Sequence, residues 1–122
     1  PERISQSDIF NARKQILDIH MSDSVENYIV QLVDASRRPA GLDVELAQWL
    51  EFGVSPRGTI ALDRCARAHA WLAGKDFVSP DDVQAVIHDI FRHRLILSFE
   101  AEATGVNSDQ VIDRLLNLVS AV

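Results

Sequence analysis

The sequence predicts an all-α fold, a small helical bundle, and three observations indicate it. Five segments carry apolar residues at the three- and four-residue spacing that gives a helix one apolar face. Each of these segments opens with residues that favour a helix N-terminus. No segment alternates apolar and polar residues long enough for a real sheet, although the irregular segments leave room for one short β-pair.

The first predicted helix covers residues 7–18. Ser5 followed by Asp8 resembles a capping box, in which each residue's side chain accepts from the other's backbone N–H. The apolar side chains form a loose stripe, made of Ile9, Phe10, Ala12, Ile16 and Leu17.

The second predicted helix covers residues 24–37, with Asp23 and Glu26 as its capping pair. Its apolar residues follow the helical spacing closely; they are Val25, Tyr28, Ile29, Leu32 and Val33. The segment 42–54 is less regular. We expect a helical turn around residues 44–50 and an extended piece beside it.

The third predicted helix starts sharply and runs to about residue 73, where Gly74 stops it. Ser55 is the expected N-cap and Pro56 the first helical residue, where its missing N–H costs nothing. The side chains expected on its apolar face are Ala61, Cys65, Ala68 and Leu72. This position favours a buried structural role for Cys65 over a reactive thiol, and the small residues would let another helix approach closely.

The fourth predicted helix repeats this start, with Ser79 as N-cap and Pro80 after it. Asp81 and Asp82 then place negative charge at the positive end of the helix dipole. Its expected inner face consists of Val83, Val86, Ile87, Ile90 and Phe91.

The fifth predicted helix follows a short apolar segment at residues 95–99. It begins near Asn107, with Gln110 at the third helical position. Its inward side chains are Val111, Ile112, Leu115, Leu116 and Val119. Together the five apolar faces supply enough area for one core.

Size and composition fit one domain. The 122 residues are 47% hydrophobic and 25% charged, which is typical of a globular protein. No apolar run approaches the ~18 residues of a membrane-spanning helix, and the start holds no signal-peptide core. Because the first residue is not methionine, we expect a piece of a longer protein. Cys65 is the only cysteine, which excludes a disulfide framework and favours the cytoplasm.

The sequence lacks the common catalytic and metal-binding motifs. It has no G-x-x-x-x-G-K-[ST], G-x-G-x-x-G, G-x-S-x-G or H-E-x-x-H pattern and no C-x-x-C pair. His88 and His93 are five residues apart and do not share a helical face, so no metal site is expected. The net charge of −6 opposes a general nucleic-acid binder, because such proteins need a basic face.

One arginine stands where local physics disfavours it. In the stretch Gly53–Gly58, Arg57 occupies the first turn of the third predicted helix, at the positive end of the helix dipole. A cation there is favourable if the helix N-terminus and the Arg57 guanidinium bind the same anion, because helix N–H groups and guanidinium groups both bind phosphate. The alternative is an exposed arginine without a partner.

Several motifs in this chain are shared with a known family. The motifs are G-A-S-P-R-A, then A-x-x-x-G-R-x-[YF]-V-x-P-x-D-V, then H-R-[IL], preceded by a Y-I-x-x-L-V-x-x-[TS]-R helix. The matching residues are Tyr28, Ile29, Leu32, Val33, Ser36, Arg37, Gly53, Ser55, Pro56, Arg57, Gly74, Phe77, Val78, Pro80, Asp82, Val83, His93, Arg94 and Leu95. By these motifs the chain resembles the C-terminal helical lid of MoxR-family AAA+ ATPases. It departs from the pattern at Lys75, where arginine is usual, and at Val54 and Gly58, where alanines are typical.

The resemblance implies a lid domain over residues 1–122 and a role for the stretch that contains Arg57. In that family this arginine is the sensor 2 residue, which reaches the γ-phosphate of ATP, so Arg57 would act in catalysis. Gly53, Ser55 and Pro56 would help to form the nucleotide-binding surface. ATP and Mg²⁺ would be bound mainly by a core domain outside this chain, so this piece alone would be inactive.

The resemblance also implies partners. They are the protein's own AAA+ core domain, neighbouring subunits of a ring that is a hexamer, and von Willebrand factor A domain proteins. The assembly would act as a chaperone-like remodeller. Two alternatives remain open from the residues: a free-standing helical module that binds a basic protein, and a helical nucleic-acid binder, which the net charge opposes.

Overall fold

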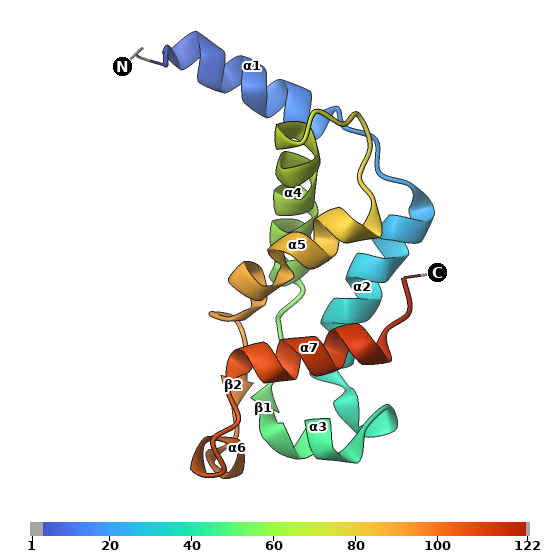
Figure 1. Cartoon of the computed structure of the whole chain (residues 1–122), viewed down its shortest axis with the longest axis vertical. Helices are drawn as coiled ribbons and strands as arrows, with labels where there is room; N and C mark the ends of the chain where they lie inside the picture. The colour runs from blue at the N-terminus through green and yellow to red at the C-terminus, as the bar shows by residue number, and fades with distance from the viewer. Residues whose placement is uncertain (1–3, 122) are drawn as a thin grey trace.

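A computed structural model describes residues 4–121 and confirms the all-α fold with one short β-pair (Figure 1). The expected domain ends, Pro1 and Val122, lie outside the described residues. Within that range the elements are α1 (Gln6–Leu17), α2 (Asp23–Arg37), the 3₁₀ turn η1 (Pro39–Gly41), α3 (Val44–Trp49), β1 (Leu50–Phe52), α4 (Arg57–Leu72), α5 (Pro80–Phe91), β2 (Ile96–Leu97), α6 (Phe99–Ala103) and α7 (Ser108–Leu118).

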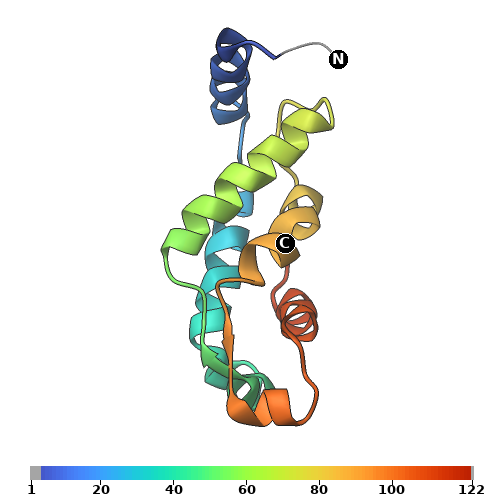
Figure 2. The same ribbon diagram turned by 90° about the vertical axis from the view of Figure 1, so that its left-hand side faces the viewer.

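The molecule is elongated, with α1 at one end and α3, α6 and the β-pair at the other (Figures 1 and 2). Four helices, α2, α4, α5 and α7, build the middle, and α4 packs most extensively on α5. The predicted faces of α2, α5 and α7 are confirmed. Side chains from all four helices are fully buried, among them Tyr28, Ile29, Leu32, Leu62, Ile87, Phe91, Ile112 and Leu115. No helix among residues 4–121 combines the length and the apolar character needed to cross a bilayer.

The buried face of α4 differs from the predicted one. The core side of α4 consists of Gly58, Leu62, Ala66 and Ala70. Cys65 is only half-buried and Leu72 is 77% exposed, so the expected face was wrong by one residue. Alanines lie on both sides of this helix, and spacing alone therefore does not identify the side that meets α5 and α2. The expected close approach is confirmed, because Ala66 and Ala70 are fully buried.

Helix α1 forms as expected but leaves its apolar stripe outside the core. Ser5 Oγ accepts from the Asp8 N–H at 3.1 Å, and Asp8 accepts from the Ser5 N–H at 3.3 Å, which confirms the capping box. No residue of α1 is buried, and Phe10 is 60% exposed. Its last turn is tied to α4, where the Trp71 indole N–H donates to Gln15 at 3.0 Å.

The irregular segments form the β-pair and a helix that was not expected. Strand β1 pairs antiparallel with β2, with Phe52 opposite Ile96 and Leu50 opposite Leu97. Helix α3 and strand β1 confirm the turn and the extended piece expected in residues 42–54. Helix α6 has only five residues, too few for a periodic apolar signal.

Helix caps agree with the predictions at α5 and α7 and differ at α2. Ser79 caps α5 and Asn107 caps α7, each in a capping box. At α2 the cap is Ser22, whose Oγ accepts from the Val25 N–H at 3.4 Å, and Asp23 is the first helical residue. Ser22 and Asp23 are both good N-cap residues, so the sequence did not separate them.

Candidate functional site

The segment Gly53–Gly58 connects β1 to the start of α4. Ser55, Pro56 and Arg57 are exposed, whereas Gly53 is half-buried. The segment therefore presents three of the four residues that sequence analysis assigned to the site on one continuous stretch of surface.

Helix α4 begins one residue later than predicted, and Ser55 is not its cap. Pro56 has helical dihedral angles, φ −56° and ψ −24°, and stands at the N-cap position. The Gly58 N–H donates to the Ser55 carbonyl at 2.8 Å, and the Thr59 N–H donates to the Pro56 carbonyl at 3.1 Å. These three-residue bonds tighten the first turn. A Ser55 hydroxyl cap would accept a hydrogen bond from the Gly58 N–H, but the Ser55 carbonyl already accepts from this N–H.

Ser36, at the end of α2, anchors the segment. Its Oγ donates to the Val33 carbonyl at 2.7 Å and accepts from the Val54 N–H at 3.0 Å. Ser36 is 1% exposed, so these bonds are shielded from water. In the sequence, Ser36 stands out only as part of a family motif. The available signal was a serine in register with the buried face of α2, where a polar group needs a partner.

Gly53 lets the segment approach the backbone of α2. A Cβ on Gly53 would lie 2.1 Å from the Ser36 carbonyl oxygen and 2.7 Å from the Arg37 nitrogen. Both atoms belong to the backbone and cannot rotate away. Gly53 therefore sets how the segment that carries Arg57 leaves β1.

The two departures from the G-A-S-P-R-A pattern compensate each other. A Cβ on Gly58 would lie 2.1 Å from Cγ1 of Val54, which is fully buried. The extra methyl groups of Val54 thus fill the space that an alanine at position 58 would use. At the start of α4, a larger residue at position 54 and a smaller one at position 58 therefore fill the same space as two alanines would.

This compensation predicts a coupled pair of substitutions. Gly58→Ala should lower the free energy of unfolding by about 1–3 kcal/mol, because it overpacks a filled space. In a Val54→Ala background the same substitution should cost less than about 0.5 kcal/mol, since the Val54 methyl groups are gone. Urea unfolding of the four proteins measures this coupling, and equal costs of Gly58→Ala in both backgrounds would contradict it.

Arg57 has no hydrogen-bond or ion-pair partner within residues 4–121. Four other arginines in that range are paired with carboxylates: Arg38, Arg67, Arg92 and Arg114. The Arg57 guanidinium is exposed and lies at the positive end of α4. It is free to bind an anion, and phosphate oxygens match its paired N–H groups.

The described residues provide an exposed cation without a partner, Arg57, but no metal-binding cluster. Among residues 4–121, no three His, Cys, Asp or Glu side chains gather closely enough to hold a metal ion. His69 and His88 each bond one carboxylate, Asp82 and Asp113, at 2.7 Å.

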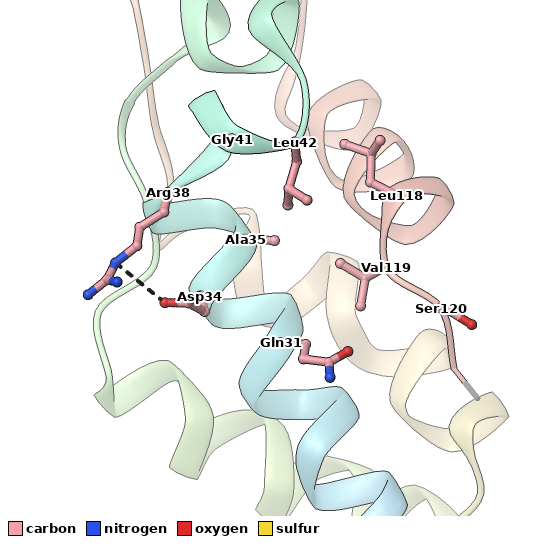
Figure 3. A pocket seen from close by; sticks show the side chains of 9 residues that line it. All are labelled: Gln31, Asp34, Ala35, Arg38, Gly41, Leu42, Leu118, Val119 and Ser120. Atoms are coloured by element: carbon pink, nitrogen blue, oxygen red, sulfur yellow. Dashed lines mark ion pairs between the residues drawn. The ribbon is translucent and has the colours of Figure 1, made fainter.

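The hollow shown in Figure 3 lies between α2, the turn η1 and the end of α7. Its volume is about 360 Å³. Arg38 and Asp34 at its rim form an ion pair at 3.7 Å. None of the residues Gly53–Gly58 lines it, so this hollow is separate from the candidate site.

A charged cluster around the buried Asp82 fixes the far end of the α4–α5 pair. Asp82 is 2% exposed and accepts from Lys75 at 2.6 Å, from His69 at 2.7 Å and from the Ser79 N–H at 2.9 Å. Asp82 therefore does more than add charge to a helix N-terminus, because it joins α4, the loop and α5. Lys75, which departs from the family pattern, supplies one of these bonds.

Asp82 titrates far below an ordinary carboxyl. Burial alone would raise its pKa, but hydrogen bonds from Lys75, the Ser79 N–H and His69 outweigh this effect and lower the pKa from 3.8 to about 2. A depressed pKa stabilises the fold above the unfolded-state value of 3.8. That stabilisation is lost as the pH falls through about 2.

We predict that Asp82→Asn lowers the free energy of unfolding by about 2 kcal/mol at pH 7, because charge-assisted hydrogen bonds are lost. The difference from the wild type should shrink as the pH falls from about 4 to about 2, since the wild-type carboxyl becomes neutral there. Denaturant unfolding of both proteins across this range measures it. Asp81→Asn, one residue earlier and exposed, is the matched control. A pH-independent difference would contradict the linkage.

Comparison with known proteins identifies the class. The AAA lid domain family matches residues 46–115, which is more than half of the chain and includes the whole segment Gly53–Gly58. The chain therefore belongs to the AAA lid domain family.

Three of the relatives that match this chain carry MoxR names. It is 33% identical to the chaperone MoxR1 of Mycobacterium tuberculosis over 96% of this chain and 31% of that protein. It is 42% identical to the protein MoxR of Paracoccus denitrificans over 65% of this chain and 25% of that protein. A crystal structure of a candidate ATPase from Cytophaga hutchinsonii superposes with a TM-score of 0.92 at 39% identity, over 96% of this chain and 36% of that one. The chain is thus an AAA lid domain that is similar to the lids of MoxR proteins, and it spans about a third of the length of the curated relatives it matches.

Proposed function

We propose that this lid contributes Arg57 as the sensor 2 residue of a MoxR-type AAA+ ATPase. The observation that carries the proposal is an exposed arginine without a partner in the first turn of α4, held there by a buried anchor on α2. The Arg57 guanidinium binds the γ-phosphate of ATP. In that position it stabilises the charge on the transferring phosphoryl group and distinguishes ATP from ADP.

The rest of the nucleotide site comes from a core domain outside this chain. That domain supplies the phosphate loop and the ligands of Mg²⁺, which suits the lack of a metal-binding cluster in residues 4–121. The length of the relatives, about three times that of this chain, supports a further domain. This chain alone does not hydrolyse ATP.

The lid also couples nucleotide state to motion. When the γ-phosphate is lost, Arg57 loses its ligand and α4 is free to move relative to the core domain. Because Ser36 and Gly53 tie this segment to α2, the movement passes to the whole helical body. In a cytoplasmic ring, a hexamer, the movement is transmitted to neighbouring subunits and to von Willebrand factor A domain partners during chaperone-like remodelling.

The test is ATP turnover by the full-length protein in which Arg57 is replaced by alanine. The isolated lid serves as the negative control. Turnover by the isolated lid would contradict the assignment of the phosphate loop to another domain.

A further inference from the structure

A second arginine, Arg94, lies against the first turn of α4, although it is distant from Arg57 in the sequence. Strand β1 ends at Phe52, which lies opposite Ile96 in β2, so the segment that leads to Arg57 and the turn that carries Arg94 both leave the same end of the β-pair. Cδ of Arg94 lies 3.7 Å from the point that a Cβ on Gly58 would occupy. The aliphatic stem of Arg94 therefore covers the residue that follows Arg57.

The backbone of Arg94 is held firmly. Its N–H donates to the Phe91 carbonyl at 2.9 Å, and the N–H of Leu95 donates to the same carbonyl at 3.1 Å. Phe91 and Leu95 are both buried. The Arg94 side chain is thus attached to a fixed turn between two core residues. The packing of α5 and the β-pair places the Arg94 stem beside α4.

The charge of Arg94 has no carboxylate partner in the described part of the chain, as is the case for Arg57. Acidic groups are not scarce, because the chain has 18 of them against 12 lysines and arginines. Arg92, only two residues earlier, pairs with Asp109 at 3.0 Å and with Asp89 at 3.2 Å. Arg57 and Arg94 are thus two cations without carboxylate partners, one in the first turn of α4 and one whose stem lies against that turn. A phosphate group can bind guanidinium groups from two side chains.

We propose that Arg94 is a second phosphate-binding residue in the site built around Arg57. The inference rests on the proposed function of Arg57. The two guanidinium groups reach the phosphate chain of one nucleotide from different elements, Arg57 from α4 and Arg94 from the turn before β2. The nucleotide then holds the start of α4 and the β-pair together, and both lose a contact when phosphate leaves.

The experiment measures binding of ATPγS and of ADP to the full-length protein by titration calorimetry. Arg94→Gln removes the charge but keeps the stem that covers Gly58, so the turn stays packed. Arg92→Ala is the matched control. It also removes one positive charge, two residues before Arg94, but the Arg92 guanidinium is already paired with Asp89 and Asp109. Arg57→Ala reports on the proposed function independently. Circular dichroism of each variant checks that the lid is folded.

We expect Arg94→Gln to raise the dissociation constant of ATPγS about tenfold, as expected for loss of a charged hydrogen bond, with Arg94→Lys intermediate and Arg92→Ala unchanged. If Arg57→Ala weakens ATPγS binding while Arg94→Gln behaves like Arg92→Ala, the inference about Arg94 is wrong and the proposed function stands. If neither Arg57→Ala nor Arg94→Gln weakens binding, both fail. Weakening by Arg94→Gln alone would overturn the shared site and the role of Arg57.

Discussion

Arg57→Ala in the full-length protein should lower kcat for ATP hydrolysis about a hundredfold, the size of effect seen when one preorganised donor to a developing charge is removed. The lid should stay folded, because the Arg57 side chain is exposed and has no partner within residues 4–121. Removing a cation from the positive end of a helix dipole should, if anything, stabilise α4 by a few tenths of a kcal/mol.

Steady-state ATPase assays measure the loss, and Arg64→Ala provides a matched control. Arg64 is also exposed on α4, seven residues further along, and has no carboxylate partner in the described range. Affinity for ATPγS should fall more than affinity for ADP, since only the former has a group at the γ position. An unchanged kcat in Arg57→Ala, with Arg64→Ala also normal, would remove the sensor role.

Local signals in the sequence predicted the elements well. Capping residues such as Ser79 and Asn107 start their helices as expected, because an N-cap acts within three residues and leaves a readable pattern. The apolar faces of α2 and α7 followed from spacing for the same reason. Arg57 was recognised as a candidate because it conflicts with the dipole of its own helix.

Contacts between distant segments were not predictable in this way. The anchor between Ser36 and Val54 joins residues 18 positions apart, and Arg94 reaches Gly58 across 36 positions, a separation that no local pattern records. Gly53 was predicted as part of the binding surface, yet its contact with the backbone of α2 depends on how the two segments pack. The buried face of α4 differs from the predicted one for the same reason, since the packing of α4 against α5 and α2 determines which of its alanines are buried.

Gly53→Ala should be the most damaging conservative substitution in the candidate site. Its Cβ would lie 2.1 Å from the Ser36 carbonyl oxygen and 2.4 Å from the Ser36 carbonyl carbon, so the backbone must move. Such a shift breaks the 3.0 Å bond from the Val54 N–H to Ser36 Oγ and leaves the buried Val54 N–H without a partner. We expect the free energy of unfolding to fall by about 3 kcal/mol.

Urea unfolding of the lid measures this loss, and Gly41→Ala is the control. Gly41 also has a negative φ, and a Cβ there would meet nothing within 4 Å. That variant should therefore match or slightly exceed the wild type, because alanine restricts the unfolded chain more than glycine does. In the full-length protein, Gly53→Ala should also lower kcat at temperatures where the lid is still folded, since Arg57 is carried by the displaced segment. A stable Gly53→Ala lid with normal ATP turnover would show that the contact with Ser36 positions nothing that catalysis needs.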